Sequence, residues 1–459
     1  MTEAATVNPF AVLRTRQYVV LLVFAAILGV PIAMVAAGFL WLVDWVQNWI
    51  YQDLPTTLGF TEVPTWWPIP PLAVAGLLVG VIIRYFPGAG GHSPADGFHA
   101  GGVPPANELT GIFLAALASL GLGAVIGPEA PLIALGGGLA VLTVRLVKKD
   151  APQQAIMVIG AAGSFAAISA LLGSPLLGAF LLMEAIGLSG AIGTVVLMPG
   201  LLASGIGALV FIGLDSLVGL GLTSLAIPGL PEFDQPDGVD FLWAIGIGIA
   251  APLIGSGIRL LSLQIRPLLQ RNLVLLTPLA GIAVAGLAIL YTQTTGHPAA
   301  DVLFSGQAEL PVLVTNSADY AGGALVMILV CKGLAYSISL AGFRGGPVFP
   351  SMFLGATIGV LLTNVAGVAL VPAVAMGIGA MCACMVRLPL TSVLLATLML
   401  GSDGIAAMPV VIVAVVVSYM ITIWLAPPPA PATAALPAPA APTSTPAPPA
   451  PGPQPAPKT

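Results

Sequence analysis

Charged side chains are scarce in this chain. Of its 459 residues, 13 are Lys or Arg and 18 are Asp or Glu. Their share of 7% compares with roughly 25% in an ordinary soluble domain. So few charges cannot cover a water-exposed globular surface, and they form no basic stripe that could bind nucleic acid. The composition therefore excludes a soluble domain and a nucleic-acid-binding protein.

Cysteine is equally scarce. The three cysteines, Cys331, Cys382 and Cys384, lie inside apolar runs, where a free cysteine behaves as a small buried hydrophobe. The sequence therefore predicts no disulfide framework, and it indicates no cofactor.

Hydrophobic residues are abundant instead, at 58% of the chain. They occur in runs long enough for membrane helices, without the alternating ten-residue segments of a transmembrane β-barrel. We therefore predict an all-α integral membrane protein, a polytopic bundle of full and broken helices in the lipid bilayer. The first run, from Tyr18 to Val43, is too long for a signal-peptide core and is expected to remain as a membrane helix.

The sign of the charges alternates between successive loops, and cytoplasmic loops carry the excess of Lys and Arg. The segments expected in the cytoplasm are 1–16, Arg84, 145–149 and 259–271, and those expected outside are 44–62, 232–240 and 301–319. The crossings that fit this alternation are 17–43, 66–83, 241–258, 273–292 and 322–341. Gly and Pro interrupt the apolar sequence at 109–227 and 352–425, so we expect pieces there shorter than the ~20 residues of a full span.

This pattern predicts five parts of the chain. They are a cytoplasmic N-terminus (1–16), a first transmembrane repeat (17–227), an extracytoplasmic loop (228–240), a second repeat with connecting helices (241–425) and a disordered Pro/Ala-rich tail (426–459). The tail consists almost entirely of Ala, Pro, Thr and Ser and lacks residues that could form a core. We expect a multi-pass protein of the inner (plasma) membrane with both termini in the cytoplasm.

Two segments share a pattern that composition alone does not produce. Residues 127–131 (GPEAP) and 346–350 (GPVFP) both read G-P-x-x-P, and each is followed by L-G at the same distance. A second echo begins at Pro175 and at Pro389, in the same order. We interpret these echoes as an internal duplication, and the charges of the loops favour two inverted halves.

The G-P-x-x-P pattern has a physical meaning. Proline is tolerated in the first turn of a helix, where its missing N–H would be unpaired anyway, so the pattern predicts a fresh helix start. A helix that begins inside the bilayer presents unbonded N–H groups and about half a positive charge, which favours an anion. Broken helices at matching places of two halves indicate a transporter site near the midplane. The alternative is that these residues serve only tight packing and kinks.

Glu129 lies inside the first motif. A charged residue within a membrane segment costs about 2.5–3.5 kcal/mol, so it is a functional candidate by default. At a helix start its carboxylate takes the place of an anion, and protonation would release it, which predicts a gate that can also carry a proton. Glu184 is the other acid within an apolar helix. For Glu184, a structural carboxylate bonded to backbone N–H groups is an equal alternative.

Over most of 1–425, the chain resembles the CLC family of chloride channels and chloride/proton antiporters, in its prokaryotic form without appended CBS domains. The family's gating motif G-K/R-E-G-P is similar to 127–131, and its chloride-binding motif G-x-F-x-P is similar to 346–350. Its anion-contacting motif G-S-G-x-P falls at 91–95, and its P-L-x-G…E-E segment matches 175–184. The resemblance implies a homodimer of inverted repeats with a pore in each subunit, for chloride or another small anion and in some members protons.

The resemblance implies roles for the matched positions. Glu129 would be the gating and proton-handling residue, and Glu184 a second acid. The residues expected to bind the anion are His92, Ser93, Gly346, Pro347, Val348 and Phe349. The remaining residues of the pore motifs are Gly91, Gly127, Pro128, Ala130, Pro131 and Pro350. No catalytic residue and no metal ligand is implied.

Three positions depart from the family pattern. His92 and Ser93 stand where the family has its anion-contacting serine. Ala185 stands where the family has the second acid of its Glu-Glu pair, which favours a channel or weakly proton-coupled transporter over a chloride/proton antiporter with an atypical proton path. The tyrosine of the family's last pore helix falls on Ala430 in the tail, and Tyr419 lies too early to replace it.

Other classes of function compete with anion transport. His92, Asp96 and His99 are spaced to share one helical face, as the ligands of a metal could in a membrane-embedded metalloenzyme. However, the Ser-Pro pair at 93–94 more naturally starts a helix. A cation/proton antiporter using Glu129 and Glu184 is disfavoured, because cation sites use helix C-termini and carbonyls.

Two cations flank the second motif. Lys332 and Arg344 lie on its expected cytoplasmic side, where they could draw anions toward the pore by long-range attraction. Equally, they could anchor the end of a helix at the membrane interface.

Overall fold

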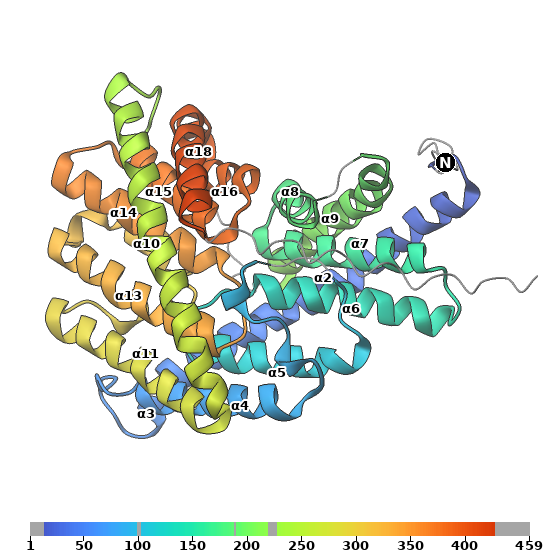
Figure 1. Cartoon of the computed structure of the whole chain (residues 1–459), viewed down its shortest axis with the longest axis horizontal. Helices are drawn as coiled ribbons and strands as arrows, with labels where there is room; N and C mark the ends of the chain where they lie inside the picture. The colour runs from blue at the N-terminus through green and yellow to red at the C-terminus, as the bar shows by residue number, and fades with distance from the viewer. Residues whose placement is uncertain (1–12, 99–101, 188–189, 219–226, 427–459) are drawn as a thin grey trace, which may run out of the picture.

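The computed structural model describes residues 13–98, 102–187, 190–218 and 227–426. Helices dominate this part of the chain, and its only β-structure is one isolated bridge between Gly127 and Gly346. The predicted all-α membrane fold is confirmed (Figure 1). Nine helices in the described residues are long and apolar enough to cross a membrane.

The first half contains helices α2 to α9 with short turns between them. Their bounds are α2 (Arg16–Asn48), η1 (Trp49–Asp53), α3 (Leu54–Thr57), α4 (Ile69–Tyr85), η2 (Pro87–Gly90), η3 (Pro94–Asp96), α5 (Ala106–Gly121), α6 (Glu129–Val147), α7 (Gln153–Leu172), α8 (Pro175–Ile186) and α9 (Gly190–Val218). The second half contains α10 (Gly238–Arg271), α11 (Leu273–Thr295), η4 (Ala299–Asp301), α12 (Glu309–Thr315), η5 (Ser317–Asp319), α13 (Gly322–Gly342), α14 (Val348–Ala366), α15 (Leu370–Val386), α16 (Pro389–Met399), α17 (Gly401–Ala406) and α18 (Met408–Leu425).

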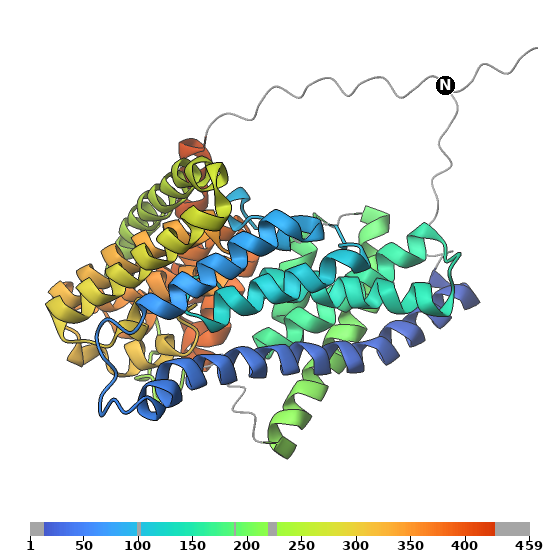
Figure 2. The ribbon, with the colours of Figure 1, turned by 90° about the horizontal axis from the view of Figure 1, so that it is seen from below.

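The two halves lie side by side and interlock at one edge (Figures 1 and 2). Helix α4 of the first half packs along α11 of the second, as the neighbouring blue and yellow helices of Figure 2 show. This approach requires small residues, because a side chain at Gly76 or Gly281 would collide with the backbone of the other helix. The contact joins the two halves through closely packed backbones.

Helix α9 contradicts the expectation of short pieces, because it continues for 29 residues through Pro199. A proline removes the N–H that would bond to the carbonyl four residues earlier, which here belongs to Val195. Tyr18 of α2 supplies another donor, since its hydroxyl lies 3.0 Å from that carbonyl oxygen. The expectation holds for α8 and α16, which span 12 and 11 residues, whereas α6, α7, α14 and α18, at 18 to 20 residues, are long and apolar enough to cross a membrane.

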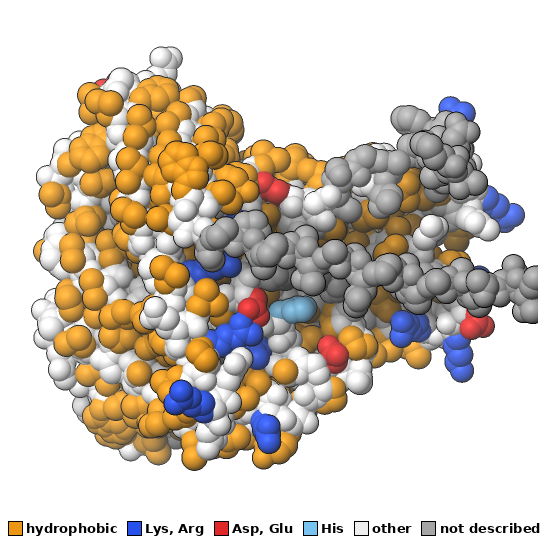
Figure 3. Space-filling view, in the orientation of Figure 1, with side chains coloured by type: hydrophobic (Ala, Val, Ile, Leu, Met, Phe, Trp, Pro, Cys, Tyr) orange, Lys and Arg blue, Asp and Glu red, His pale blue; other side chains and the backbone are white. Residues whose placement is uncertain are grey.

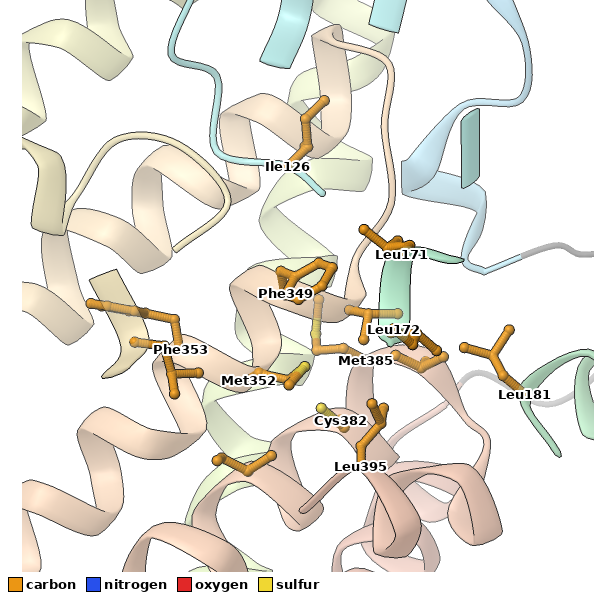
Figure 4. Close-up of a cluster of buried hydrophobic side chains, with 14 of the residues drawn as sticks. Ile126, Leu171, Leu172, Leu181, Phe349, Met352, Phe353, Cys382, Met385 and Leu395 are labelled. Atoms are coloured by element: carbon orange, nitrogen blue, oxygen red, sulfur yellow. The ribbon is translucent and has the colours of Figure 1, made fainter. Parts of the chain in front are cut away.

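Buried apolar side chains from both halves meet at the centre of the molecule (Figure 4). The residues labelled there come from α7, α8, α14, α15, α16 and the loop before α6, and include Ile126, Leu171, Leu172, Leu181, Phe349, Met352, Cys382, Met385 and Leu395. All three cysteines are buried and free, as predicted. This cluster supports the segment in which the two motifs meet.

Candidate functional site

Two prolines start the two helices on which the site is built. Helix α6 begins directly after Pro128, and α14 begins directly after Pro347. The predicted helix starts are therefore confirmed. Pro131 and Pro350 lie in the first turns, where an N–H would have no partner within the helix.

The two motifs meet each other across the interface between the halves. The N–H of Gly127 donates to the carbonyl of Gly346 at 2.7 Å, and the N–H of Gly346 donates to the carbonyl of Gly127 at 2.6 Å. This reciprocal pair places equivalent residues of the two repeats opposite each other. As a result, the N-termini of α6 and α14 approach one point.

Glu129 occupies the point where the two helices begin. Its side chain is fully buried, and its Oε1 accepts the N–H of Phe349 at 2.8 Å. Its Oε2 has no hydrogen-bond partner among the described residues. The carboxylate of the first repeat therefore lies at the start of the helix of the second, a position that suits an anion.

Cavities lie on both sides of Glu129. One, the Arg344 cavity, has a volume of about 320 Å³, and the residues lining it include Gly91, His92, Glu108, Ala130, Pro131, Arg344 and Gly345. The other, the Glu309 cavity, has about 140 Å³, and the residues lining it include Asp44, Gln47, Pro128, Phe304 and Glu309. Because Pro128 lines one cavity and Ala130 lines the other, Glu129 stands between them.

The Arg344 cavity brings together the loops of all three motifs, at 91–95, 127–131 and 346–350 or immediately beside them. On the face seen in Figure 3, Lys and Arg side chains gather around acidic and His side chains near the middle of a largely apolar surface. The Glu309 cavity carries two acids and no basic residue among the residues that line it. The two cavities thus differ in charge.

The family model described as "Voltage gated chloride channel" matches residues 75–422, which include all three motifs. The chain belongs to the CLC family. The resemblance that the motifs indicate is therefore confirmed, and the protein is a multi-pass membrane protein of the CLC type.

Relatives and solved structures agree with this assignment. The chain is 26% identical over 351 residues to proteins named "Putative ion-transport protein YfeO" from Escherichia coli O1:K1 and Shigella boydii serotype 4, covering 76% of this chain and 80% of each relative. A slow cyanobacterial Cl−/H+ antiporter has a similar structure, with a TM-score of 0.68, 19% identity and coverage of 88% of this chain and 97% of that one. A CLC-type fluoride/proton antiporter is also similar, with a TM-score of 0.64, 17% identity and coverage of 88% of this chain and 95% of that one. At these identities the structures show a shared fold.

The third motif of this CLC protein lies in the turn before η3. Gly91 has a φ of 95°, a conformation that favours glycine. His92 lines the Arg344 cavity, whereas the Oγ atom of Ser93 is buried and has no hydrogen-bond partner. Both residues that could replace the family's serine are therefore placed at the site, in different ways.

The proposed metal face is wrong. Helix η3 contains only Pro94–Asp96 and ends at Gly97, whose φ is 102°, so His92 precedes the helix and shares no helical face with Asp96. Asp96 instead pairs with Arg266. His99 lies outside the described residues, and within them no group of three or more His, Cys, Asp or Glu could hold a metal.

Glu184 is tied to a helix start in the other half. Its carboxylate accepts the N–H of Leu390 at 3.0 Å and both the N–H and the hydroxyl of Thr391, at 2.8 and 2.7 Å. It thereby caps α16 and joins the second echo of one repeat to that of the other, since α8 and α16 begin at Pro175 and Pro389. This geometry fits the alternative that Glu184 is a structural carboxylate bonded to backbone N–H groups.

Two residues at the site escaped the sequence analysis. The hydroxyl of Tyr336 donates to the carbonyl of Pro347 at 2.9 Å, and the hydroxyl of Ser351 donates to the same oxygen. Both side chains are buried and fix the segment just before α14. Tyr419 is half-buried on α18, and Ala430 lies outside the described residues. A search for tyrosines in the helix preceding the second motif would have found Tyr336.

Lys332 is neither at the membrane surface nor beside the Arg344 cavity. Its side chain is fully buried, and its Nζ donates to the carbonyls of Asp301, Val302 and Leu303 at 3.1, 3.3 and 3.0 Å. It also lies 4.3 Å from the centre of the Phe353 ring. The expectation that it attracts anions or anchors a helix at the interface is wrong, because all its donors serve the loop after α11.

Proposed function

We propose that this CLC protein transports a small anion, chloride above all, and that Glu129 gates its path. The observation that carries this proposal is the carboxylate of Glu129 at the start of α14, between the Arg344 and Glu309 cavities. A carboxylate in that place competes with an anion for the N–H of Phe349. Protonation or displacement of the carboxylate would free the N–H for an anion and connect the two cavities.

We further propose a channel or weakly proton-coupled transporter. Supporting this, Glu184 is engaged by three hydrogen bonds at α16, and the next residue is Ala185 rather than a second acid. A chloride/proton antiporter is the second candidate, because Glu108 lines the Arg344 cavity and could pass protons on that side. The anion contacts would come from Ser93, His92 and the N–H groups of Val348 and Phe349, because Pro347 has no N–H and the N–H of Gly346 is bonded to Gly127.

Membership of the CLC family supports a proposal for the assembly, and the loop charges support one for the orientation. We propose a homodimer in the plasma membrane, with both termini and the Arg344 cavity on the cytoplasmic side, where Lys and Arg gather. In each subunit the pore would lie between the repeats at 17–227 and 241–425. The tail at 426–459 would be a solvated extension without a site of its own.

Purified protein in lipid vesicles tests the function. We expect chloride efflux above that of empty vesicles once a potassium ionophore balances the charge. In opposing chloride and proton gradients, we expect a reversal potential that follows chloride and ignores pH. Absence of efflux would contradict anion transport, and uphill proton movement driven by chloride would establish the antiporter instead.

A further inference from the structure

Arg344 is a charged side chain held almost completely inside the protein. It lies in the turn between α13 and α14, directly before the second motif, and is 8% exposed. What remains accessible faces the Arg344 cavity, of about 320 Å³. For comparison, a water molecule takes up about 30 Å³ of the liquid, so the cavity has room for a polyatomic ion with some of its water.

The side-chain hydrogen bonds of Arg344 go to carbonyls and to no acid. Its Nε donates to the carbonyl of Ala89 at 3.1 Å, and its Nη1 donates to the carbonyl of Phe343 at 3.2 Å. Arg266 and Asp96 act on Arg344 electrostatically, and these two residues pair with each other. In the described part of the chain this is the one ion pair, so Arg344 itself is not paired with a carboxylate there.

These two bonds also fix the plane of the guanidinium group. Nη2 has no hydrogen-bond partner among the described residues, and Nη1 keeps a second N–H, so the Nη1–Nη2 edge is left as a two-donor fork. Such a fork matches two oxygens of one planar anion and gains less from a single spherical halide. Glu108 lines the same cavity and would repel an anion of higher charge.

We propose that Arg344 makes this cavity a binding site for monovalent planar oxyanions, of which nitrate is the simplest, and that it sets a preference for them over chloride. The inference rests on the proposed function in taking the cavity as part of the anion path. It adds a residue that belongs to none of the three motifs. The fork of Arg344 would meet an oxyanion before the ion reaches Ser93 and Glu129.

Calorimetric titration of the purified full chain in detergent, with sodium nitrate and with sodium chloride, tests the site directly. We expect the wild type to bind nitrate more tightly than chloride. Arg344→Lys keeps the charge but loses the fork, so nitrate should bind about tenfold more weakly, with chloride changed by less than about twofold. Arg344→Gln should weaken both ions. Arg84→Gln, an exposed arginine away from the cavity, should change neither.

The outcomes separate this inference from the proposed function. A wild type that binds chloride at least as tightly as nitrate, or an Arg344→Lys variant that weakens both ions equally, would overturn the oxyanion site. Neither of these two comparisons uses Arg344→Gln, so both remain decisive even if that variant fails to fold through loss of its bond to Ala89. Because calorimetry needs no transport, nitrate binding through Arg344 in a protein that passes no anion would overturn the proposed function alone. Chloride flux together with unchanged nitrate binding in Arg344→Lys would overturn the inference alone.

Discussion

At the scale of single residues, Glu129 and an incoming anion need the same donor. The N–H of Phe349 lies 2.8 Å from Oε1, and a carboxylate accepts such a bond more strongly than a neutral group does. The second oxygen has no partner, so the side chain is held at one end only. Loss of its charge therefore weakens the contact that keeps the anion out.

Glu129→Gln keeps the shape of the side chain and removes its charge. Replacing a charge-assisted hydrogen bond with a neutral one weakens the contact that competes with the anion by about 1 kcal/mol. Chloride flux should therefore rise about fivefold. In the wild type, flux should rise as pH falls and Glu129 takes up a proton, whereas the variant should be fast at every pH. Vesicle efflux between acidic and alkaline pH measures both effects.

Glu184→Gln is the matched control, because it makes the same chemical change at an acid that caps α16. It should keep the pH response of the wild type. Equal flux and an unchanged pH response in Glu129→Gln would remove the gating role.

Sequence alone could identify residues whose roles depend on a local pattern. Glu129 and Phe349 stand in motifs that start helices, and proline acts on the residues next to it. Tyr336 could not be found in that way, because only the folded chain brings its hydroxyl to the carbonyl of Pro347. The hydroxyl of Ser351 reaches the same carbonyl from four residues further along the chain, which is a local contact of serine in a helix. The three carbonyls around Lys332 are more remote, at 29 to 31 residues along the chain.

At the scale of elements, the starts of α6 and α14 are pressed together by the bridge between Gly127 and Gly346. A side chain at Gly346 would meet the carboxylate of Glu129 and the backbone nitrogen of Ala130, the latter at 3.1 Å. The backbone of Gly346 is not in the left-handed region, so alanine is excluded by space and not by conformation. Tight approach of the two repeats thus depends on this glycine.

Gly346→Ala should lower the free energy of unfolding by about 1–3 kcal/mol through overpacking. Part of that cost comes from contact between the new side chain and the Glu129 carboxylate, so Glu129→Ala should relieve that part. In the double variant we expect a coupling energy above about 0.5 kcal/mol. Unfolding in detergent measures all four proteins of the cycle. Gly323→Ala on α13, where a side chain meets nothing, should cost nothing comparable. Additive losses in the double variant would show that the two residues do not press on each other.

The same distinction between local and distant causes explains which elements the sequence predicts. The starts of α6, α8, α14 and α16 follow from prolines in the chain itself. The continuity of α9 through Pro199 depends on a hydroxyl from α2, and the pairing of α4 with α11 depends on glycines that face each other only in the fold. Neither leaves a pattern in its own segment.

At the scale of the whole molecule, the few charges are distributed unequally about the path. Arg344 and Glu108, of opposite charge, line one cavity, whereas two acids, Asp44 and Glu309, line the other. A cavity lined by charges of one sign changes the local concentration of ions. Anions should therefore enter less readily from the Glu309 cavity than from the Arg344 cavity, an asymmetry that the net charge of −5 alone would not reveal.

Asp44→Asn tests this asymmetry. One charge about 8 Å from an ion in water contributes about 0.5 kcal/mol, so its removal should lower the half-saturating chloride concentration on the Glu309 side about twofold. The effect should vanish near 1 M salt, where the screening length is about 3 Å. Asp53→Asn is the control, because Asp53 is an exposed acid nearby that does not line the cavity. Chloride uptake by protein incorporated in one orientation, at low and high salt, measures the difference. If Asp44→Asn and Asp53→Asn behave alike at low salt, the charges of the cavity do not control entry, and access is set by the Glu129 gate alone.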